Sequence, residues 1–302
     1  MIYNIHHTTR FIYQHWIGFS HNLVRLQPRE TALQSLIHFD LSVSPAVAEM
    51  DGFTDFFGNR VHHLLVREPH IELKVTASSR VRIDLEALLR REEQRRQATG
   101  LLLGEALERM DSLSAEVLEA KPYTLRSPLL QHASAAISEY ARLSLRPERS
   151  LYEGITELME RMFTDFSFVS GFTDITTPVE TVFREKKGVC QDFAHFAITA
   201  LRSLGLAVRY MSGYIETDPP EGEEKLFGVD ASHAWISVFF PGYGWFEFDP
   251  TNNIAPYDRH LLLGFGRDYS DVAPMQGVVI GSGSSHLEVM VDVRQDKETE
   301  QE

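Results

Sequence analysis

The sequence has little cysteine, little positive charge and no long apolar run, and each of these shortages excludes a class of protein or partner. Its 302 residues include one cysteine, Cys190, so no disulfide can form within the chain. Acidic residues outnumber basic ones by 43 to 29, which gives a net charge of −14. Without a basic patch, we expect neither nucleic acid nor an anionic membrane as a partner. No apolar run approaches the length of about 18 residues that a membrane-spanning helix needs.

The start of the sequence also lacks the features of an export signal. Residues 1–10 contain no basic stretch followed by an apolar core. We therefore expect a cytoplasmic protein, in which a reducing environment preserves a free thiol. The 13 histidines show no spacing typical of a zinc site, and no calcium-binding loop is evident. We expect no metal and no cofactor.

The one cysteine lies at the start of a predicted helix. Cys190 belongs to the segment Gly-Val-Cys-Gln-Asp-Phe-Ala-His-Phe, residues 188–196. Apolar residues then recur at steps of three and four: Ala194, Ala197, Ile198, Leu201 and Leu204. The helix is predicted to end at Gly205, a typical C-terminal cap. The first turn of a helix offers free N–H groups and a positive dipole end, which favour thiolate, the nucleophilic form of cysteine. Alternatively, Cys190 is a small core residue, as free cysteines often are.

Two β-rich runs further along predict an antiparallel hairpin. Residues 231–240 and 245–253 flank the turn Pro-Gly-Tyr-Gly. If Phe240 pairs with Gly244, Asp249 lies on the same face as His233 and diagonal to it, at about 7–8 Å. A pairing slipped by one residue would place these two side chains on opposite faces.

Cys190, His233 and Asp249 are therefore candidate catalytic residues: a nucleophile, a base and a carboxylate that orients the base. The imidazole would take the thiol proton and later deliver it to the leaving group. Each residue also has a simpler interpretation, because His233 suits a sheet interior and Asp249 suits a strand end before Pro250.

The same segments resemble the transglutaminase-like superfamily, in its bacterial, cysteine-peptidase-like branch. The core resemblance rests on residues 188–195, 209–214, 232–235 and 245–251. Outside the core, residues 266–278 are similar to the C-terminal signature of that branch, and residues 25–29 and 55–59 to its N-terminal β domain. The resemblance covers nearly the whole chain.

The resemblance implies an α+β fold: a papain-like, transglutaminase-like core preceded by an all-β domain. Its cysteine lies on a helix N-terminus, and its histidine and aspartate lie on an antiparallel sheet. We predict a β domain over residues 1–83, a helical connector over 84–126, and a catalytic domain with a C-terminal β segment over 127–302. Alternating apolar residues at 71–77 fit the first of these.

Several local elements are also predicted from the sequence. Helices are expected to start at Ser127–Pro128 and at Ser150, and a hairpin to have its tip at Gly58–Asn59. The runs 277–280 and 287–293 are expected to close the chain as a hairpin. The acidic loop 216–225 is either a solvated excursion or an acidic rim beside the site.

For activity, we expect a cysteine-dependent amide-bond hydrolase that acts on a peptide or protein through a thioester. One alternative is a transglutaminase, a protein-glutamine gamma-glutamyltransferase that uses an amine acceptor. Another is a non-catalytic binding or assembly protein that keeps the fold. The backbone N–H of Cys190 is one candidate oxyanion donor, and Gln191 and Trp235 are candidates for the oxyanion site or substrate groove.

Overall fold

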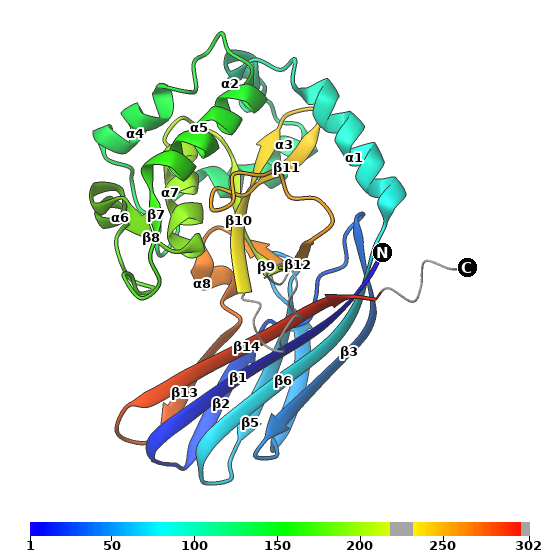
Figure 1. Cartoon of the computed structure of the whole chain (residues 1–302), viewed down its shortest axis with the longest axis vertical. Helices are drawn as coiled ribbons and strands as arrows, with labels where there is room; N and C mark the ends of the chain where they lie inside the picture. Colours follow the sequence, from blue (N-terminus) through cyan, green and yellow to red (C-terminus); the bar gives the residue numbers. More distant parts are fainter. Residues whose placement is uncertain (218–231, 297–302) are drawn as a thin grey trace, which may run out of the picture.

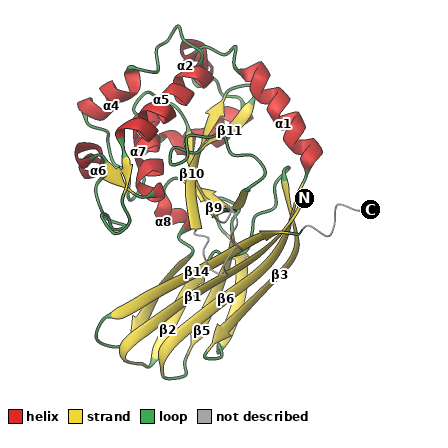
Figure 2. Ribbon diagram, in the orientation of Figure 1, coloured by secondary structure: helices red, strands yellow, loops and turns green. Residues whose placement is uncertain are grey.

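The computed structural model describes residues 1–217 and 232–296 and divides into two stacked units (Figure 1). One unit consists of helices around a small four-stranded sheet, and the other consists of two facing sheets without helices (Figure 2). None of the helices in the described part of the chain combines the length and the apolar character needed to cross a membrane.

The β unit contains two four-stranded sheets, ordered β14-β1-β6-β3 and β13-β2-β5-β4. Its strands are β1 (Ile2–Ile17), β2 (Phe19–Val24), β3 (Gln34–Ser44), β4 (Glu49–Thr54), β5 (Arg60–Val66), β6 (His70–Ile83), β13 (Met275–Ile280) and β14 (Ser285–Gln295). Strand β6 shows the predicted alternation, with Leu73, Val75 and Ala77 buried between the sheets. The predicted hairpin with its tip at Gly58–Asn59 is formed by β4 and β5.

The C-terminal strands do not form the closing hairpin that the sequence suggested. Strand β14 pairs along β1, from Tyr3 with Gln295 to Tyr13 with Ser285, and β13 pairs with β2 in the other sheet. Strands near both ends of the described chain therefore build the β unit. Strands β13 and β14 do not belong to the four-stranded sheet of the helical unit. Local patterning predicted the strands correctly but carried no information about a partner more than 250 residues away.

The connector is helical, as expected. It comprises α1 (Leu85–Ala98), α2 (Leu103–Arg109), α3 (Ala115–Ala120) and a 3₁₀ turn, η1 (Lys121–Thr124). Asp84 caps α1 by accepting the N–H of Ala87 at 3.0 Å. On α1, Arg90 forms an ion pair with Glu86 at 3.5 Å. Buried residues of α3 and η1 pack with Ala207 and Phe239 on the sheet of the second unit.

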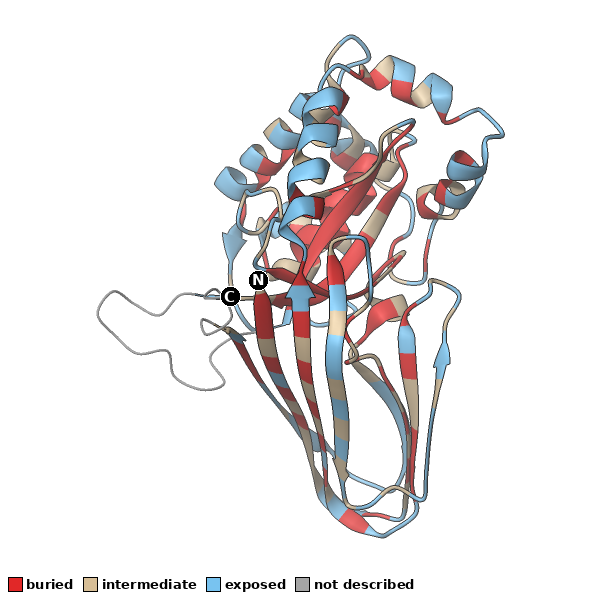
Figure 3. Cartoon of the chain, turned by 90° about the vertical axis from the view of Figure 1, so that its right-hand side faces the viewer, coloured by how far each residue is buried: buried red, intermediate tan, exposed pale blue. Residues whose placement is uncertain are grey.

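The second unit is built around an antiparallel sheet ordered β11-β10-β9-β12. Its elements are α4 (Ala135–Arg142), α5 (Leu151–Asp165), β7 (Ser167–Phe168), α6 (Val179–Glu185), β8 (Lys187–Gly188), α7 (Cys190–Arg202), β9 (Val208–Ile215), β10 (Ser232–Phe240), β11 (Gly244–Phe248), β12 (His260–Gly266) and α8 (Tyr269–Val272). Helix α7 packs against β10 and β9. Figure 3 shows this sheet as the most continuously buried part of the chain.

Two of the predicted helix starts are confirmed and one is wrong. Helix α7 begins at Cys190, and α5 begins after the N-cap Ser150. Helix α4 begins after Ser134, not at Ser127–Pro128. The earlier residues form a turn, because the side chain of Asp268 accepts the N–H of Leu129 at 2.8 Å and draws the backbone away from helical geometry.

The two units are joined by the N-terminal segments that resembled a family signature. Asn59 accepts the N–H of Phe265 at 3.0 Å and donates to its carbonyl at 2.9 Å. The Gln34 side chain bonds both the N–H and the carbonyl of Leu262, each at 2.9 Å. These two side chains bond to backbone groups of β12 in the way that a neighbouring strand would. They thereby hold the sheet of the second unit against the β unit.

Candidate active site

The register between β10 and β11 brings the predicted histidine and aspartate together. Phe240 pairs with Gly244 and Ile236 with Phe248, which is the predicted register. Asp249 is the next residue after β11, and its backbone N–H donates to the carbonyl of Ile254 at 2.9 Å. Its side chain consequently lies on the same face of the sheet as His233.

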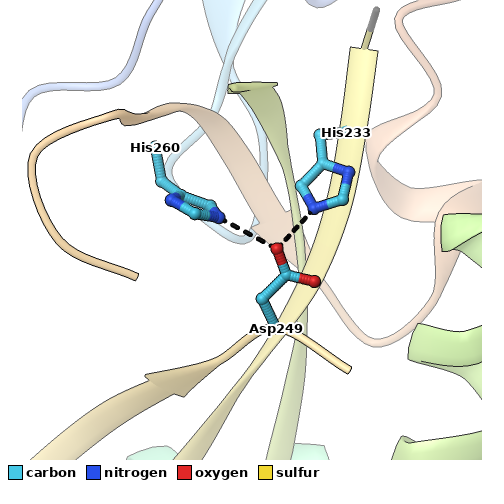
Figure 4. A group of neighbouring side chains, drawn as sticks. All are labelled: His233, Asp249 and His260. Carbon is cyan, nitrogen blue, oxygen red and sulfur yellow. Dashed lines mark hydrogen bonds and ion pairs between the residues drawn. The ribbon is translucent and has the colours of Figure 1, made fainter. Parts of the chain in front are cut away.

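His233 and Asp249 form a direct, buried hydrogen bond (Figure 4). The distance from Nε2 to Oδ2 is 2.7 Å, and the two side chains are only 8% and 0% exposed. The second carboxylate oxygen accepts the backbone N–H groups of Thr251 and Asn252 at 2.9 and 3.2 Å. The turn after β11 therefore holds the carboxylate rigidly toward the imidazole.

A second histidine, which the sequence analysis missed, shares the same oxygen. His260 begins β12 and lies with its Nε2 3.1 Å from Oδ2 of Asp249 (Figure 4). The amide of Asn252 also donates to this oxygen, at 2.7 Å. A histidine at the start of the next strand was the available signal, but its position depends on the path of the loop over residues 250–259, which no local pattern predicts.

These contacts shift the pKa values of the pair in opposite directions. Burial alone would lower the pKa of His233, but its hydrogen bond to Asp249, the negative charge of that carboxylate and the interaction with Cys190 raise the value to about 9. Burial would raise the pKa of Asp249, but hydrogen bonds from His233 and His260 hold it below its usual range. An imidazolium–carboxylate pair is thus favoured at neutral pH.

Cys190 occupies the first turn of α7, where the sequence predicted it, and is partly exposed. Asp192 supports this helix start by accepting the N–H of Val189 at 2.7 Å, and Thr173 donates to the same carboxylate oxygen at 2.5 Å. A Cβ on Gly188 would lie 2.7 Å from the Cβ of Asp192, so this capping arrangement requires glycine. Gln191 follows the cysteine and is also partly buried.

Trp235 does not fit the oxyanion role considered for it. Its side chain is fully buried, and its indole N–H donates to Glu247 at 2.6 Å. The ring stacks on His233 and meets His260 edge-on, with centroid distances of 6.0 and 5.2 Å. With its only donor engaged, Trp235 supports the two histidines by packing and has no N–H left for an oxyanion.

His233, Asp249 and His260 also each present one ligand atom within 4.8 Å of the others, an arrangement that could hold a metal ion. The two hydrogen bonds to Oδ2 of Asp249 account for this convergence without an ion. The expected absence of a metal stays a prediction. The predicted acidic rim lies, from residue 218 onward, outside the described residues.

A cysteine at a helix N-terminus beside a buried histidine–aspartate pair on an antiparallel sheet defines the class of thiol enzymes with a papain-like arrangement. The comparisons with known proteins agree. Residues 3–82 match the model of the bacterial transglutaminase-like N-terminal region, and residues 138–250 match that of the transglutaminase-like superfamily. The chain belongs to the transglutaminase-like superfamily, as its resemblance indicated, and has the expected fold.

Two curated proteins and one solved structure are similar to this chain. An uncharacterised protein of Mycobacterium tuberculosis is 35% identical over 302 residues, covering 96% of this chain and 92% of its own. The crystal structure of a candidate cysteine protease from Cytophaga hutchinsonii is 21% identical with a TM-score of 0.74, covering 98% of this chain and 92% of that one. A protein-glutamine gamma-glutamyltransferase of Pseudomonas aeruginosa is 32% identical over 76 residues, covering 25% of this chain and 11% of its own.

Proposed function

We propose that this protein is a cysteine-dependent amide-bond hydrolase with Cys190 as nucleophile, His233 as acid and base, and Asp249 as the residue that orients the base. The observation that carries the proposal is the 2.7 Å bond between His233 and Asp249, together with the interaction of the same imidazole with Cys190, which raises the pKa of His233. The fold supports a cysteine-dependent enzyme, and the reaction is the part we propose.

Before the first half-reaction, the proton of the Cys190 thiol already lies on His233, which gives a thiolate–imidazolium pair. Because Nε2 is bonded to Asp249, the proton shared with the cysteine is on Nδ1. The thiolate attacks the amide carbonyl carbon, and the electron pair of the C=O bond moves to the oxygen. The N–H of Cys190, which has no acceptor within its own helix, stabilises this oxyanion. The intermediate collapses as the C–N bond breaks, and the amine leaves with the proton from His233.

The second half-reaction releases the acyl group from the thioester. His233 takes a proton from water, and the hydroxide attacks the thioester carbonyl. The C–S bond then breaks to give the carboxylic acid product and restores the thiolate–imidazolium pair. Asp249 keeps its charge throughout and stabilises the imidazolium, the usual role of such a carboxylate. We propose a peptide or protein as the substrate, and the cytoplasm as its location.

The second candidate reaction is acyl transfer to an amine. The segment shared with the Pseudomonas aeruginosa protein-glutamine gamma-glutamyltransferase favours it. The first half-reaction would be the same for a glutamine side chain, with ammonia as the leaving group. A primary amine would then replace water as the attacker of the thioester.

The experiment is a competition between water and an amine. The purified protein is incubated with glutamine-containing peptides and a biotinylated primary amine, and products are analysed by mass spectrometry. Hydrolysis predicts peptide cleavage or a mass gain of about 1 Da from deamidation, whereas transfer predicts amine-labelled peptide. Cys190→Ala must abolish either product, because that variant lacks the nucleophile. Equal product with this variant would exclude both candidates.

A further inference from the structure

A cavity lies next to the active site, and the two share His260, which lines the cavity and bonds to Asp249. It has a volume of about 370 Å³ and is enclosed by α1, the loop before β3 and the face of the sheet that also carries His233 and Asp249. We call it the back pocket and define it by Arg29, Arg91, Arg209, Trp245, His260 and Phe265. Cys190 is not among its lining residues, although His260 also bonds to Asp249 of the active site.

The back pocket has two guanidinium groups against one aromatic ring. Arg29 and Arg209 lie 4.2 and 4.1 Å from the ring centroid of Phe265, and Arg209 also lies 3.6 Å from that of Trp245. Among the described residues, neither arginine has a carboxylate within 4.0 Å. The wall therefore holds two neighbouring cations whose direct contacts are aromatic faces and neutral groups. The negative charge of Asp55 also acts on Arg29, but Asp55 already pairs with Arg25 at 3.8 Å.

The remaining charges of the lining do not cancel this excess. Arg91 stacks on Phe246 at 4.5 Å, and the charge of Glu247, whose Oε2 accepts the indole N–H of Trp235, offsets its burial in part. Arg95 and Glu92, which also line the cavity, form an ion pair with each other. Glu30 lies at the exposed rim.

Burial acts on the pKa values of these cations more strongly than the nearby negative charges do. Burial lowers the pKa of Arg29 and of Arg91, and it lowers that of Arg209 to about 10, with the charge of Arg29 acting in the same direction. The Nε atom of Arg209 is buried without a hydrogen-bond partner in the described part of the chain. Buried donors and unbalanced charges are costly unless a partner satisfies them.

We propose that the back pocket binds a small organic anion, with its carboxylate or phosphate between Arg29 and Arg209 and its apolar body against Trp245 and Phe265. Guanidinium groups bind both anions through charge-assisted, often bidentate hydrogen bonds. The volume is near the lower limit of about 300–1,000 Å³ for ligand pockets, so the ligand is about the size of a single ring with an acidic group. This site goes beyond the proposed function and does not depend on it.

Calorimetric titration of the Cys190→Ala protein tests the proposal, because this background removes the thiol and its chemistry. The probes are phenylacetate, phenyl phosphate and the neutral analogue phenylacetamide. We expect at least one anion to bind, and the amide to bind at least about tenfold more weakly, since it lacks the charge. The ratio of the two anion affinities distinguishes a carboxylate ligand from a phosphate ligand. Equal binding of all three probes, or no binding of any, would overturn the proposal.

Three further substitutions in the same background locate the site. Arg209→Gln should weaken anion binding by about tenfold or more, because it removes a buried charge-assisted contact. Ala32→Trp, at an exposed rim position, should block the cavity sterically. The matched control Glu30→Gln removes a rim negative charge and should tighten binding by about twofold.

Thermal melting shows whether each variant is folded. If Arg209→Gln fails to fold, Ala32→Trp and the neutral analogue decide the outcome. Unchanged anion affinity in a folded Ala32→Trp protein would place any binding elsewhere and contradict the proposal.

Discussion

Two regions of the second unit each combine a buried histidine with a buried aspartate, yet they differ in chemistry. One region, the proposed catalytic end, consists of Cys190, His233 and Asp249. The other region, which we call the brace, consists of His195 on α7 and Asp268 at the start of α8. All four histidine and aspartate residues are at most 8% exposed. The two regions therefore separate the effect of burial from the effect of a direct contact.

In the brace, the histidine and the aspartate are not bonded to each other. His195 accepts the backbone N–H of Tyr269 at 3.2 Å, and Asp268 accepts those of Leu129 and Ser270. Burial lowers the pKa of His195 to about 4, although the charge of Asp268 opposes the shift. His195 is thus neutral and structural, whereas the direct bond to Asp249 makes His233 a cation at neutral pH. Contact with the carboxylate, and not burial, separates the charged histidine from the neutral one.

The largest effect is expected for Asp249→Asn. Losing the carboxylate removes the hydrogen bond and charge that raise the pKa of His233, so burial would then dominate and leave the ring neutral. We expect the rate of Cys190 alkylation by iodoacetamide at pH 7 to fall by about 100-fold.

The matched control is Asp268→Asn, which alters an equally buried carboxylate in the brace. It should lower the melting temperature and leave the alkylation rate near that of the wild type. Similar alkylation rates for Asp249→Asn and Asp268→Asn would show that the two carboxylates do not differ in their effect on Cys190.

A smaller effect is expected for His260→Gln. His260 acts through Asp249 and touches no reacting atom, so we class it as a positioning residue. Losing one charge-assisted bond to the carboxylate should lower the alkylation rate by about tenfold and shift its pH profile, because Asp249 would hold His233 less firmly. His260→Asn, whose side chain is shorter, should lower the alkylation rate at least as much as His260→Gln does. A changed melting temperature with an unchanged pH profile would make His260 merely structural.

The pH dependence of stability should have opposite signs in the two regions. The folded-state pKa of His233 is raised from 6.5 to about 9, so its stabilisation is fully present below pH 6.5 and is lost as the pH rises through 9. This loss is on the order of 3 kcal/mol. The folded-state pKa of His195 is lowered to about 4, so stability is lost as the pH falls from 6.5 through 4.

Chemical denaturation across this pH range measures both effects. Relative to the wild type, His233→Ala should flatten the alkaline limb of the unfolding free energy, and His195→Asn should flatten the acidic limb. Changes on the wrong limbs would reverse the assignment of the charged and neutral histidines.

The smallest effect on reactivity is expected for Trp235→Phe. The indole N–H is engaged by Glu247, so its loss should leave the alkylation rate and the acyl-transfer rate nearly unchanged. The free energy of unfolding should fall by about 1–3 kcal/mol, because Glu247 loses its partner in a partly buried place. A drop of about 100-fold in acyl transfer without loss of alkylation would instead identify Trp235 as an oxyanion donor.

Much of the site followed from short-range patterns. Apolar periodicity placed Cys190 at the start of α7, and the turn chemistry of Pro241–Gly244 set the hairpin register that brings His233 to Asp249. Both inferences depend on residues close in sequence, where the repeat of a helix or strand determines which side chains share a face.

The parts that were missed depend on distant partners. Strands β13 and β14 pair with β2 and β1 across most of the chain, and the approach of His260 to Asp249 is set by an irregular loop. The back pocket exists only because α1 and the β unit pack against the same sheet face. The sequence also does not predict the pKa values of His195 and His233, since these depend on neighbours brought together by folding.

The most direct test of the account is the pH dependence of iodoacetamide alkylation of the single cysteine in the native wild type, His233→Ala and His195→Asn. A free thiol has a pKa of about 8.5 and reacts slowly at pH 6. We predict that wild type and His195→Asn react rapidly at pH 6, and that His233→Ala loses this reactivity and follows a free thiol. If all three proteins share one profile, His233 does not act on Cys190, and the proposed nucleophile–base pair is wrong.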